Sequence, residues 1–268
     1  NFEGLGGSQT HNEKSGVAHF MAEDEKECLD MIKVLLSYLP QNNLESPPST
    51  SGSSTRDTKK LESIVPDDPK KPYDMRDVIS EVFDKRTFFE IQSTFAANIV
   101  VGFARLNGSV VGIVANQPKV LAGCLDINSS DKISRFVRFC DCFSIPLINL
   151  VDVTGYLPGT SQEHKGIIRH GAKVLYAYSE ATVPKISLVL RKAYGGAYIA
   201  LVSKDMGFDK VIAWPTAEIA VMGAEQAVNI INRKQLNGKN AQKIRANLVS
   251  EYKEKYLNPY VAAKLGKV

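Results

Sequence analysis

The sequence predicts an α/β protein in which helices pack against a largely parallel β-sheet. Short apolar runs with strand character alternate with amphipathic helical segments from residue 129 onward, and this alternation is typical of parallel sheets covered by helices. The chain of 268 residues is long enough to bury a sizeable core in one or two domains. Its 44% hydrophobic and 23% charged residues are ordinary values for a globular protein.

The N-terminal part of the chain predicts two helices with a linker between them. Residues 23–39 have the spacing of an acidic, amphipathic helix that ends at Pro40. Residues 40–58 are rich in Ser, Thr, Pro and Asn, so we expect a mobile linker or a surface loop. A second helix is expected from residue 73 to about residue 86. The apolar face of the first helix comprises Leu29, Ile32, Leu36 and Leu39.

A β-hairpin is predicted next, followed by alternating helices and strands. Ile99–Leu106 and Val110–Val114 are apolar runs on either side of Asn107-Gly108, and Asn-Gly supplies the positive φ angles of a type I′ turn. Ser129-Ser130-Asp131 has the residue types of a helix N-cap. The later helices are expected at 162–180, from about 224, and at 233–256; the later strands are expected at 147–151, 186–190 and 210–214.

Charge and cysteine usage exclude several function classes. The net charge is only +4, and Lys and Arg are interspersed with Asp and Glu, so we expect no nucleic-acid partner. None of the four cysteines belongs to a CxxC pair, which argues against a zinc site and fits a reducing compartment. We therefore expect no metal and a cytoplasmic location, or the mitochondrial matrix if the source is a eukaryote.

The turn Tyr194-Gly195-Gly196-Ala197 is the first candidate for chemistry. It joins an apolar strand to an expected helix, and the first N–H groups of a helix have no intrahelical partner. Paired glycines let a ligand approach the backbone closely, and the helix dipole favours negative charge there. The turn is therefore either a site for an oxyanion or a plain strand-to-helix corner.

The loop from Asp152 to Gly159 is the second candidate. It follows an expected strand and precedes a helix, where α/β folds usually place binding loops. Two glycines and a proline would fix its shape, although an ordinary connection could have the same composition. Asp152 is expected to brace the loop by hydrogen bonding. Glu218 lies in an apolar segment and would need a partner if buried, either an Arg at a subunit contact or the site itself.

Several motifs in combination resemble the carboxyltransferase subunit of biotin-dependent acyl-CoA carboxylases, the group of the propionyl-CoA carboxylase β-chain. They keep the order of that family and cover nearly the whole chain, with residues 40–60 the weakest part. The matching segments are Gly6-Gly7 with Thr10-His11, Ser15–His19, Gly112–Pro118, Arg135–Asp141, Gly155–Gly159, Arg191–Tyr198 and Trp214–Gly223.

The resemblance implies a crotonase-like fold of repeated β-β-α units and a division of the chain. Residues 1–20 would be the tail of an N-terminal acyl-CoA-binding domain, residues 21–72 a helix and linker, and residues 73–268 the C-terminal carboxyltransferase domain, clipped at its end. The implied cofactor is biotin on a carboxyl carrier protein, and the implied partners are that carrier, a biotin carboxylase subunit and an acyl-CoA substrate. Dimers assembling into a hexamer are implied for the full-length form.

The resemblance also assigns residues. The amides of Gly196 and Ala197 would hold the ureido oxygen of biotin and act in catalysis. Many propionyl-CoA carboxylases have Asp where this chain has Ile199, so Ile199 is expected to affect acyl specificity. The Gly-Gly-Ala-Tyr-Ile-Ala sequence looks more like methylmalonyl-CoA decarboxylase α-subunits. The expected biotin-binding set is Tyr194, Gly195, Gly196, Ala197, Gly155, Tyr156, Pro158 and Gly159.

Three functional alternatives follow. The first is a carboxyltransferase that moves carboxyl from carboxybiotin to the α-carbon of a short-chain acyl-CoA such as propionyl-CoA. The second is a decarboxylase α-subunit or transcarboxylase that runs the transfer from acyl-CoA to biotin. The third is a fragment that acts only in binding and oligomerisation, because the acyl-CoA half would be missing and this chain alone would show no turnover.

Overall fold

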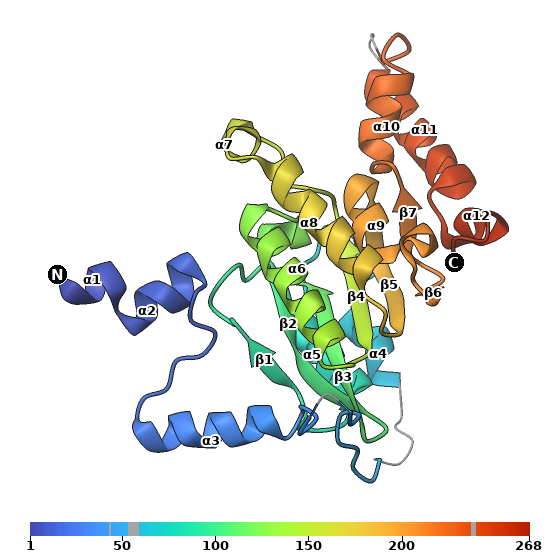
Figure 1. Cartoon of the computed structure of the whole chain (residues 1–268). Coiled ribbons are helices and arrows are strands. Elements are labelled where there is room, and N and C mark those ends of the chain that lie inside the picture. The colour runs from blue at the N-terminus through green and yellow to red at the C-terminus, as the bar shows by residue number, and fades with distance from the viewer. Residues whose placement is uncertain (43, 53–58, 237–239) are drawn as a thin grey trace.

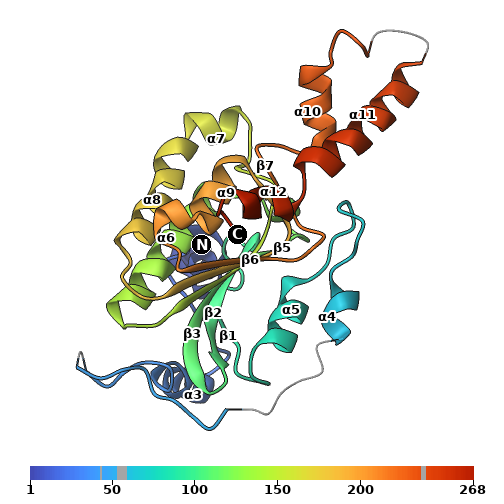
Figure 2. The same cartoon turned by 90° about the vertical axis from the view of Figure 1, so that its right-hand side faces the viewer.

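The structure is a computed structural model that describes residues 1–42, 44–52, 59–236 and 240–268. A central β-sheet carries helices on both faces (Figures 1 and 2). The strands are β1 Phe89–Ile91, β2 Ile99–Leu106, β3 Ser109–Asn116, β4 Leu147–Val153, β5 Lys185–Tyr194, β6 Lys210–Ala213 and β7 Glu218–Ala220.

The sheet is mixed, and its parallel half carries the functional loops. The strand order is β1-β2-β3-β4-β5-β6, with β7 also paired to β5. β1, β2 and β3 are antiparallel neighbours, whereas the pairs from β3 to β6 and the pair β5–β7 are parallel. The prediction of a largely parallel sheet therefore holds beyond the N-terminal hairpin.

The predicted β2–β3 hairpin is confirmed together with its turn. Asn107 has φ 51° and Gly108 has φ 84°, the two positive angles that a type I′ turn needs. The expected linker contacts the hairpin turn, because the Thr50 amide donates to the Gly108 carbonyl at 3.1 Å. Arg105 Nη1 donates to the Pro48 carbonyl at 2.6 Å. Residues 43 and 53–58 of the linker lie outside the described residues.

One face of the sheet is covered by α6 (Ile127–Cys142), α8 (Ile167–Glu180) and α9 (Gly195–Val202) (Figure 2). The predicted cap of α6 is wrong: Asp126, not the Ser129 segment, is the N-cap, and it forms a capping box with Ser129. A Cβ on Gly112 of β3 would lie 2.5 Å from the Cys140 sulfur, so the glycine permits close packing of α6 on the sheet.

The expected helix over residues 162–180 is two helices. α7 (Thr160–His164) ends before Gly166, which has φ 87°, and α8 begins at Ile167. Glycine adopts this left-handed angle without the steric cost that other residues bear.

The charged helix is also shorter than predicted, because α11 spans Ala241–Tyr256 rather than beginning at residue 233. Residues 237–239 of that prediction lie outside the described residues.

The opposite face carries α4 (Lys59–Ile64) and α5 (Met75–Val82). The expected extension of α5 to residue 86 is wrong, since Phe83 is already extended with φ −96° and ψ 168°. α3 (Glu25–Leu36) matches the first predicted helix, but Leu29, Ile32 and Leu36 on its apolar face are 47–60% exposed. α4 lies in the segment that the sequence predicts as linker.

Short helices occur at both ends of the chain, and two longer ones project from the body. α10 (Ala224–Ile231) and α11 form an antiparallel hairpin that stands away from the sheet, and α12 (Pro259–Lys264) leads back toward it (Figures 1 and 2). α1 (Phe2–Gly6) and α2 (Ser8–Thr10) lie apart from the sheet at the N-terminus. Within the described ranges, no helix is long and apolar enough to span a bilayer.

Candidate active site

The two loops that the sequence singles out meet at the carboxyl ends of neighbouring strands. β4 and β5 are parallel, and Val153 near the end of β4 is in register with Ala193 near the end of β5. The loop after β4 and the turn after β5 therefore open at the same edge of the sheet. This edge is where open α/β sheets bind ligands.

The glycine turn presents the unpaired amides of a helix N-terminus. Tyr194 is the N-cap of α9 and its side chain caps no backbone amide. Gly195 has φ 59°, an angle that favours glycine. The amides of Gly195, Gly196 and Ala197 form the first turn of α9, so they have no carbonyl partner within the helix. Ala197 is fully buried, which anchors this turn against the core.

The loop from Gly155 to Gly159 is held in place by its neighbours. Gly155 and Gly159 have φ 139° and 130°. The Leu125 amide donates to the Gly155 carbonyl at 3.0 Å, and the Leu157 amide donates to the Leu125 carbonyl at 2.7 Å. The Tyr156 hydroxyl donates to the Gly171 carbonyl of α8 at 3.3 Å. These bonds fix the Tyr156 ring beside the glycine turn.

A pocket of about 430 Å³ joins the two loops. Gly196 and Ile199 come from α9, Tyr156 and Pro158 come from the loop, and residues of α8 complete the lining. The wall is apolar except for Glu163. Tyr194, Gly195, Ala197, Gly155 and Gly159 belong to the two turns but do not line the pocket. The sequence did not predict the contribution of α8. The lining residues are Tyr156, Leu157, Pro158, Glu163, Ile167, Ile168, Gly171, Ala172, Leu175, Gly196 and Ile199.

Tyr194 points away from the pocket wall toward β7 and α11. Its hydroxyl donates to Glu218 Oε2, and Lys253 Nζ of α11 lies 3.1 Å from Glu218 Oε1. Burial, followed by the Glu218 carboxylate, raises the pKa of the Tyr194 hydroxyl. Glu218 thus has partners within this chain, a lysine and a tyrosine rather than the expected arginine.

Asp152 braces the edge of the sheet as predicted. Its Oδ2 lies 2.9 Å from Nη2 and 3.0 Å from Nε of Arg191, and both side chains are at most 6% exposed. Arg191 Nη1 also donates to the carbonyls of Asp68 at 3.1 Å and Lys71 at 2.8 Å, and its guanidinium lies over the Tyr73 ring. The sequence did not indicate this role of Arg191, whose partners include the Pro66 carbonyl, 125 residues away.

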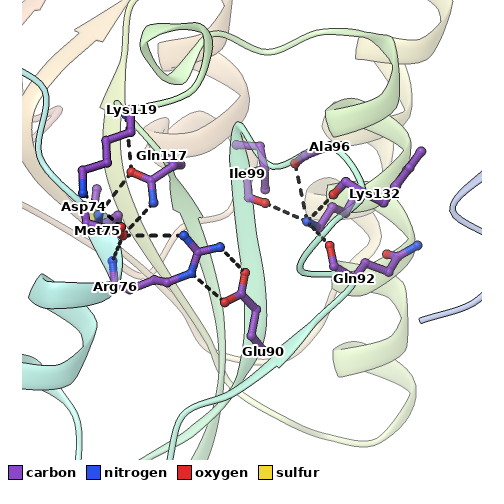
Figure 3. Close-up of polar contacts among 11 residues, drawn as sticks. Asp74, Met75, Arg76, Glu90, Gln92, Ala96, Ile99, Gln117, Lys119 and Lys132 are labelled. Atoms are coloured by element: carbon purple, nitrogen blue, oxygen red, sulfur yellow. Dashed lines mark hydrogen bonds and ion pairs between the residues drawn. The ribbon is translucent and has the colours of Figure 1, made fainter. Parts of the chain in front are cut away.

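A buried lysine supports the loop between β1 and β2 (Figure 3). Lys132 of α6 is 2% exposed, and its ammonium donates to the carbonyls of Gln92, Phe95 and Ile99 at 2.7–2.8 Å. Nearby, Arg76 and Glu90 form a bidentate pair with two contacts of 2.7 Å. These residues stabilise the fold rather than the pocket.

The histidines and cysteines add no further reactive centre to the pocket. His170 Nδ1 lies 2.8 Å from Asp131 Oδ2. Cys140 on α6 is buried and Cys142 is exposed. Among the residues that the structure describes, no cluster of His, Cys, Asp and Glu could hold a metal ion.

Comparison with known proteins gives a family and several similar proteins. The carboxyl transferase domain model matches residues 1–268. The propionyl-CoA carboxylase carboxyltransferase subunit of Haloferax mediterranei is 57% identical over 268 residues, 99% of this chain and 52% of that protein. The methylmalonyl-CoA decarboxylase subunit alpha of Veillonella parvula is 55% identical over 266 residues, 98% of this chain and 51% of that protein.

Solved structures agree with this family match. A transcarboxylase 12S crystal structure with methylmalonyl-coenzyme A and methylmalonic acid bound is 54% identical with a TM-score of 0.94, and the match covers 99% of this chain and 52% of that one. This match shows the predicted α/β, crotonase-like fold. The chain spans about half the length of these relatives. It belongs to the carboxyl transferase domain family.

Proposed function

We propose that this chain supplies the biotin side of a carboxyltransferase that moves a carboxyl group between carboxybiotin and a short-chain acyl-CoA such as propionyl-CoA. The observation that carries the proposal is the pocket lined by Gly196, which lies in the first turn of α9. Family membership supports it, and so does 57% identity to a protein named as a propionyl-CoA carboxylase carboxyltransferase subunit.

The pocket fits the chemistry of biotin. The bicyclic ring of biotin is neutral and largely apolar, with one strong acceptor, the ureido oxygen. Tyr156, Leu157 and Pro158 supply an apolar wall, and the α9 amides supply the donors. Gly196 leaves room for a ring, because a Cβ added there would lie 3.7 Å from the Tyr156 ring and would fill the space between turn and loop.

When bound, biotin supplies an activated carboxyl group on a ring nitrogen. The backbone amides of Gly196 and Ala197 would hold the ureido oxygen and would stabilise negative charge there. One such preorganised donor contributes roughly 3–4 kcal/mol to a transition state. The apolar wall excludes water, which strengthens these hydrogen bonds. This role needs no side-chain nucleophile and no metal.

Partners, chain division and location belong to the same proposal. A biotin carboxyl carrier protein would deliver the cofactor, a biotin carboxylase subunit would load it, and the acyl-CoA would bind the half of the enzyme for which residues 1–20 form the tail. Residues 73–268 would form the second carboxyltransferase domain. The similar transcarboxylase 12S structure is a hexamer assembly, which supports a homo-oligomer for the full-length protein. A cytoplasmic or mitochondrial-matrix location follows from the same reaction.

The reverse direction is the second candidate function. Ile199 lies at the pocket and is 49% exposed, and 55% identity to a methylmalonyl-CoA decarboxylase subunit alpha supports it. An apolar residue there would give the acyl pocket a different shape and charge from the one that Asp would give. Replacing Ile199 with Asp and comparing acetyl-CoA, propionyl-CoA and methylmalonyl-CoA in the enzyme that contains both halves tests whether this position selects the acyl group, and unchanged relative rates would contradict that role.

Binding of biotin to the purified chain tests the assignment. A short biotinylated peptide should shift the ¹⁵N–¹H resonances of Gly196 and Ala197, and the same peptide carrying 2-iminobiotin should bind at least about tenfold more weakly. The imine presents an N–H where biotin presents the ureido oxygen. Equal binding of both peptides, or shifts confined to other amides, would refute the ureido site and favour a chain that acts only in assembly.

A further inference from the structure

A chain of polar contacts runs from the projecting helical hairpin to the glycine turn. Lys253 lies on α11, Glu218 lies on β7, and Tyr194 is the last residue of β5. Lys253 Nζ is 3.1 Å from Glu218 Oε1, and the Tyr194 hydroxyl donates to Oε2 of the same carboxylate. Both carboxylate oxygens of Glu218 therefore have a partner: Oε1 contacts Lys253 and Oε2 accepts from Tyr194.

The backbone reinforces this link. β7 pairs with β5 in parallel, with Lys192, Ala193 and Tyr194 opposite Glu218, Ile219 and Ala220. These are the last three residues before the turn. A Cβ on Gly195 would lie 3.1 Å from the Val221 carbonyl, so the turn rests directly on the segment that follows β7. The position of β7 thus sets the direction in which the first amides of α9 point.

The same region joins the hairpin to the turn by packing. Tyr194 belongs to a small buried cluster with Ala224 of α10 and Leu257, which follows α11, and Tyr252 of α11 packs against it. A Cβ on Gly223 would lie 3.5 Å from the Tyr194 ring. α10 and α11 have few other contacts with the body (Figure 1). The Tyr194 side chain is therefore a main anchor of the hairpin.

We propose that Glu218 and Lys253 are positioning residues that hold the glycine turn in its ligand-ready geometry through Tyr194. Glu218 is largely buried, with a side chain 15% exposed, whereas Lys253 is 43% exposed. Lys253 neutralises a carboxylate that would otherwise stand uncompensated beside a turn that stabilises negative charge. The inference rests on the proposed biotin site and adds two residues that touch neither the pocket nor its ligand.

Binding of the biotinylated peptide to variants of the full chain tests this role. We expect Lys253→Met to raise the Kd about tenfold and to shift the Gly196 and Ala197 amides of the free protein, because small misplacements of binding groups have large effects. The matched control is Lys255→Met on the same helix, whose ammonium lies over the Tyr256 ring at 5.1 Å. It removes the same charge and should leave the Kd unchanged.

Two further variants separate positioning from simple loss of fold. Glu218→Gln keeps an acceptor and should bind closer to wild type than Glu218→Ala does, with both followed by circular dichroism. The double variant Lys253→Met with Glu218→Gln removes both charges and should recover part of the affinity that Lys253→Met loses.

The outcomes distinguish the two proposals. If wild type fails to bind the biotinylated peptide, the proposed function fails. If wild type binds it but Lys253→Met leaves the Kd and the amide shifts unchanged, the positioning role is overturned and the biotin site stands. Equal losses in Lys253→Met and Lys255→Met would also overturn it, since a general charge effect would then explain both.

Discussion

At the scale of single residues, Gly196 shows how a missing side chain makes a site. It lies in the first turn of α9 with a helical φ, so its conformation does not require glycine. A Cβ there would make an ordinary van der Waals contact with the Tyr156 ring at 3.7 Å, so alanine fits the fold but would occupy space that a ligand needs. Gly196 therefore contributes a backbone amide and the open space left by its missing side chain, and it contributes no side-chain functional group.

Gly196→Ala should separate binding from stability. We expect the biotinylated peptide to bind at least about tenfold more weakly, since the methyl fills the gap. The free energy of unfolding should rise by about 0.4–1 kcal/mol, because alanine restricts the unfolded chain. Gly4→Ala is the control: a Cβ at Gly4 in α1 meets nothing within 4 Å. It should leave binding intact. Unimpaired binding in Gly196→Ala would remove Gly196 from the site.

Lys132 is the residue on which the loop between β1 and β2 most depends. Lys132→Met should cost at least about 2 kcal/mol in urea denaturation, because three buried carbonyls lose their donor. The control is Lys119→Met, whose side chain is 53% exposed and pairs with Asp74 at 3.4 Å. An exposed pair contributes less than about 1 kcal/mol. Equal costs for the two variants would contradict the importance of the carbonyl cage.

The ammonium of Lys132 also gives stability a pH dependence. Burial lowers the pKa of Lys132 to about 7 from 10.5, while the carboxylate of Glu90 opposes that shift. Between those values the unfolded chain binds a proton that the folded chain lacks. The stability of wild type relative to Lys132→Met should therefore fall as pH falls from 10.5 to 7, by at most about 1.4 kcal/mol per unit. Denaturation at pH 7 and 9.5 measures the difference.

At the scale of elements, β4 and β5 form the edge from which the site is built. Asp152 and Arg191 hold the two strands together and tie them to the carbonyls of residues 66–71. The register shifts between Val151 and Val153, so extra residues of β5 accommodate the pair. The buried ion pair between Asp152 and Arg191 therefore stabilises this edge together with the hydrogen bonds of the sheet.

Asp152→Asn should destabilise the protein by about 3–5 kcal/mol, because it leaves the buried guanidinium of Arg191 without a counter-charge. Glu180→Gln is the matched change at an exposed pair: Arg138 and Glu180 are 67% and 60% exposed. That control should cost less than about 0.5 kcal/mol. Urea midpoints of both variants measure the contrast, and similar midpoints would show that the buried pair contributes little.

Elements with a strong local pattern could be predicted from the sequence, and the others could not. The β2–β3 hairpin and α6 have long apolar runs with a clear turn signal or period. β1 and β7 have three residues each, too few for a period, and the break at Gly166 depends on one backbone angle. The glycine turn and the Gly155 loop were predictable because their residue types are unusual. The α8 wall of the pocket was not, since packing alone brings it there.

At the scale of the whole molecule, the body and the projecting hairpin differ in how they are stabilised. Two buried apolar clusters pack on opposite faces of the sheet. α11 contributes no buried residue, and the hairpin joins the body through the small cluster around Tyr194. The sheet therefore carries most of the buried apolar area that stabilises the fold.

Hydrogen exchange should reveal this difference. Amides of Ala241–Tyr256 should exchange through local opening at a lower free energy than amides of Leu147–Val153, because few buried contacts must break. Mass spectrometry of peptides from both segments measures it. If the two segments share one protection factor, the hairpin and sheet unfold as a single unit, and the anchor at Tyr194 is stronger than its few contacts indicate.

The tight β2–β3 hairpin has a consequence for the order of folding. Leu106 and Ser109 pair across two residues, and such local pairings form within microseconds. β4 and β5 pair only after residues some 38 positions apart, such as Leu147 and Lys185, have met, and distant pairings form more slowly. The hairpin then serves as the template on which β4 adds. The ligand pocket, built at the far end of those later strands, is complete only when the last crossover has closed.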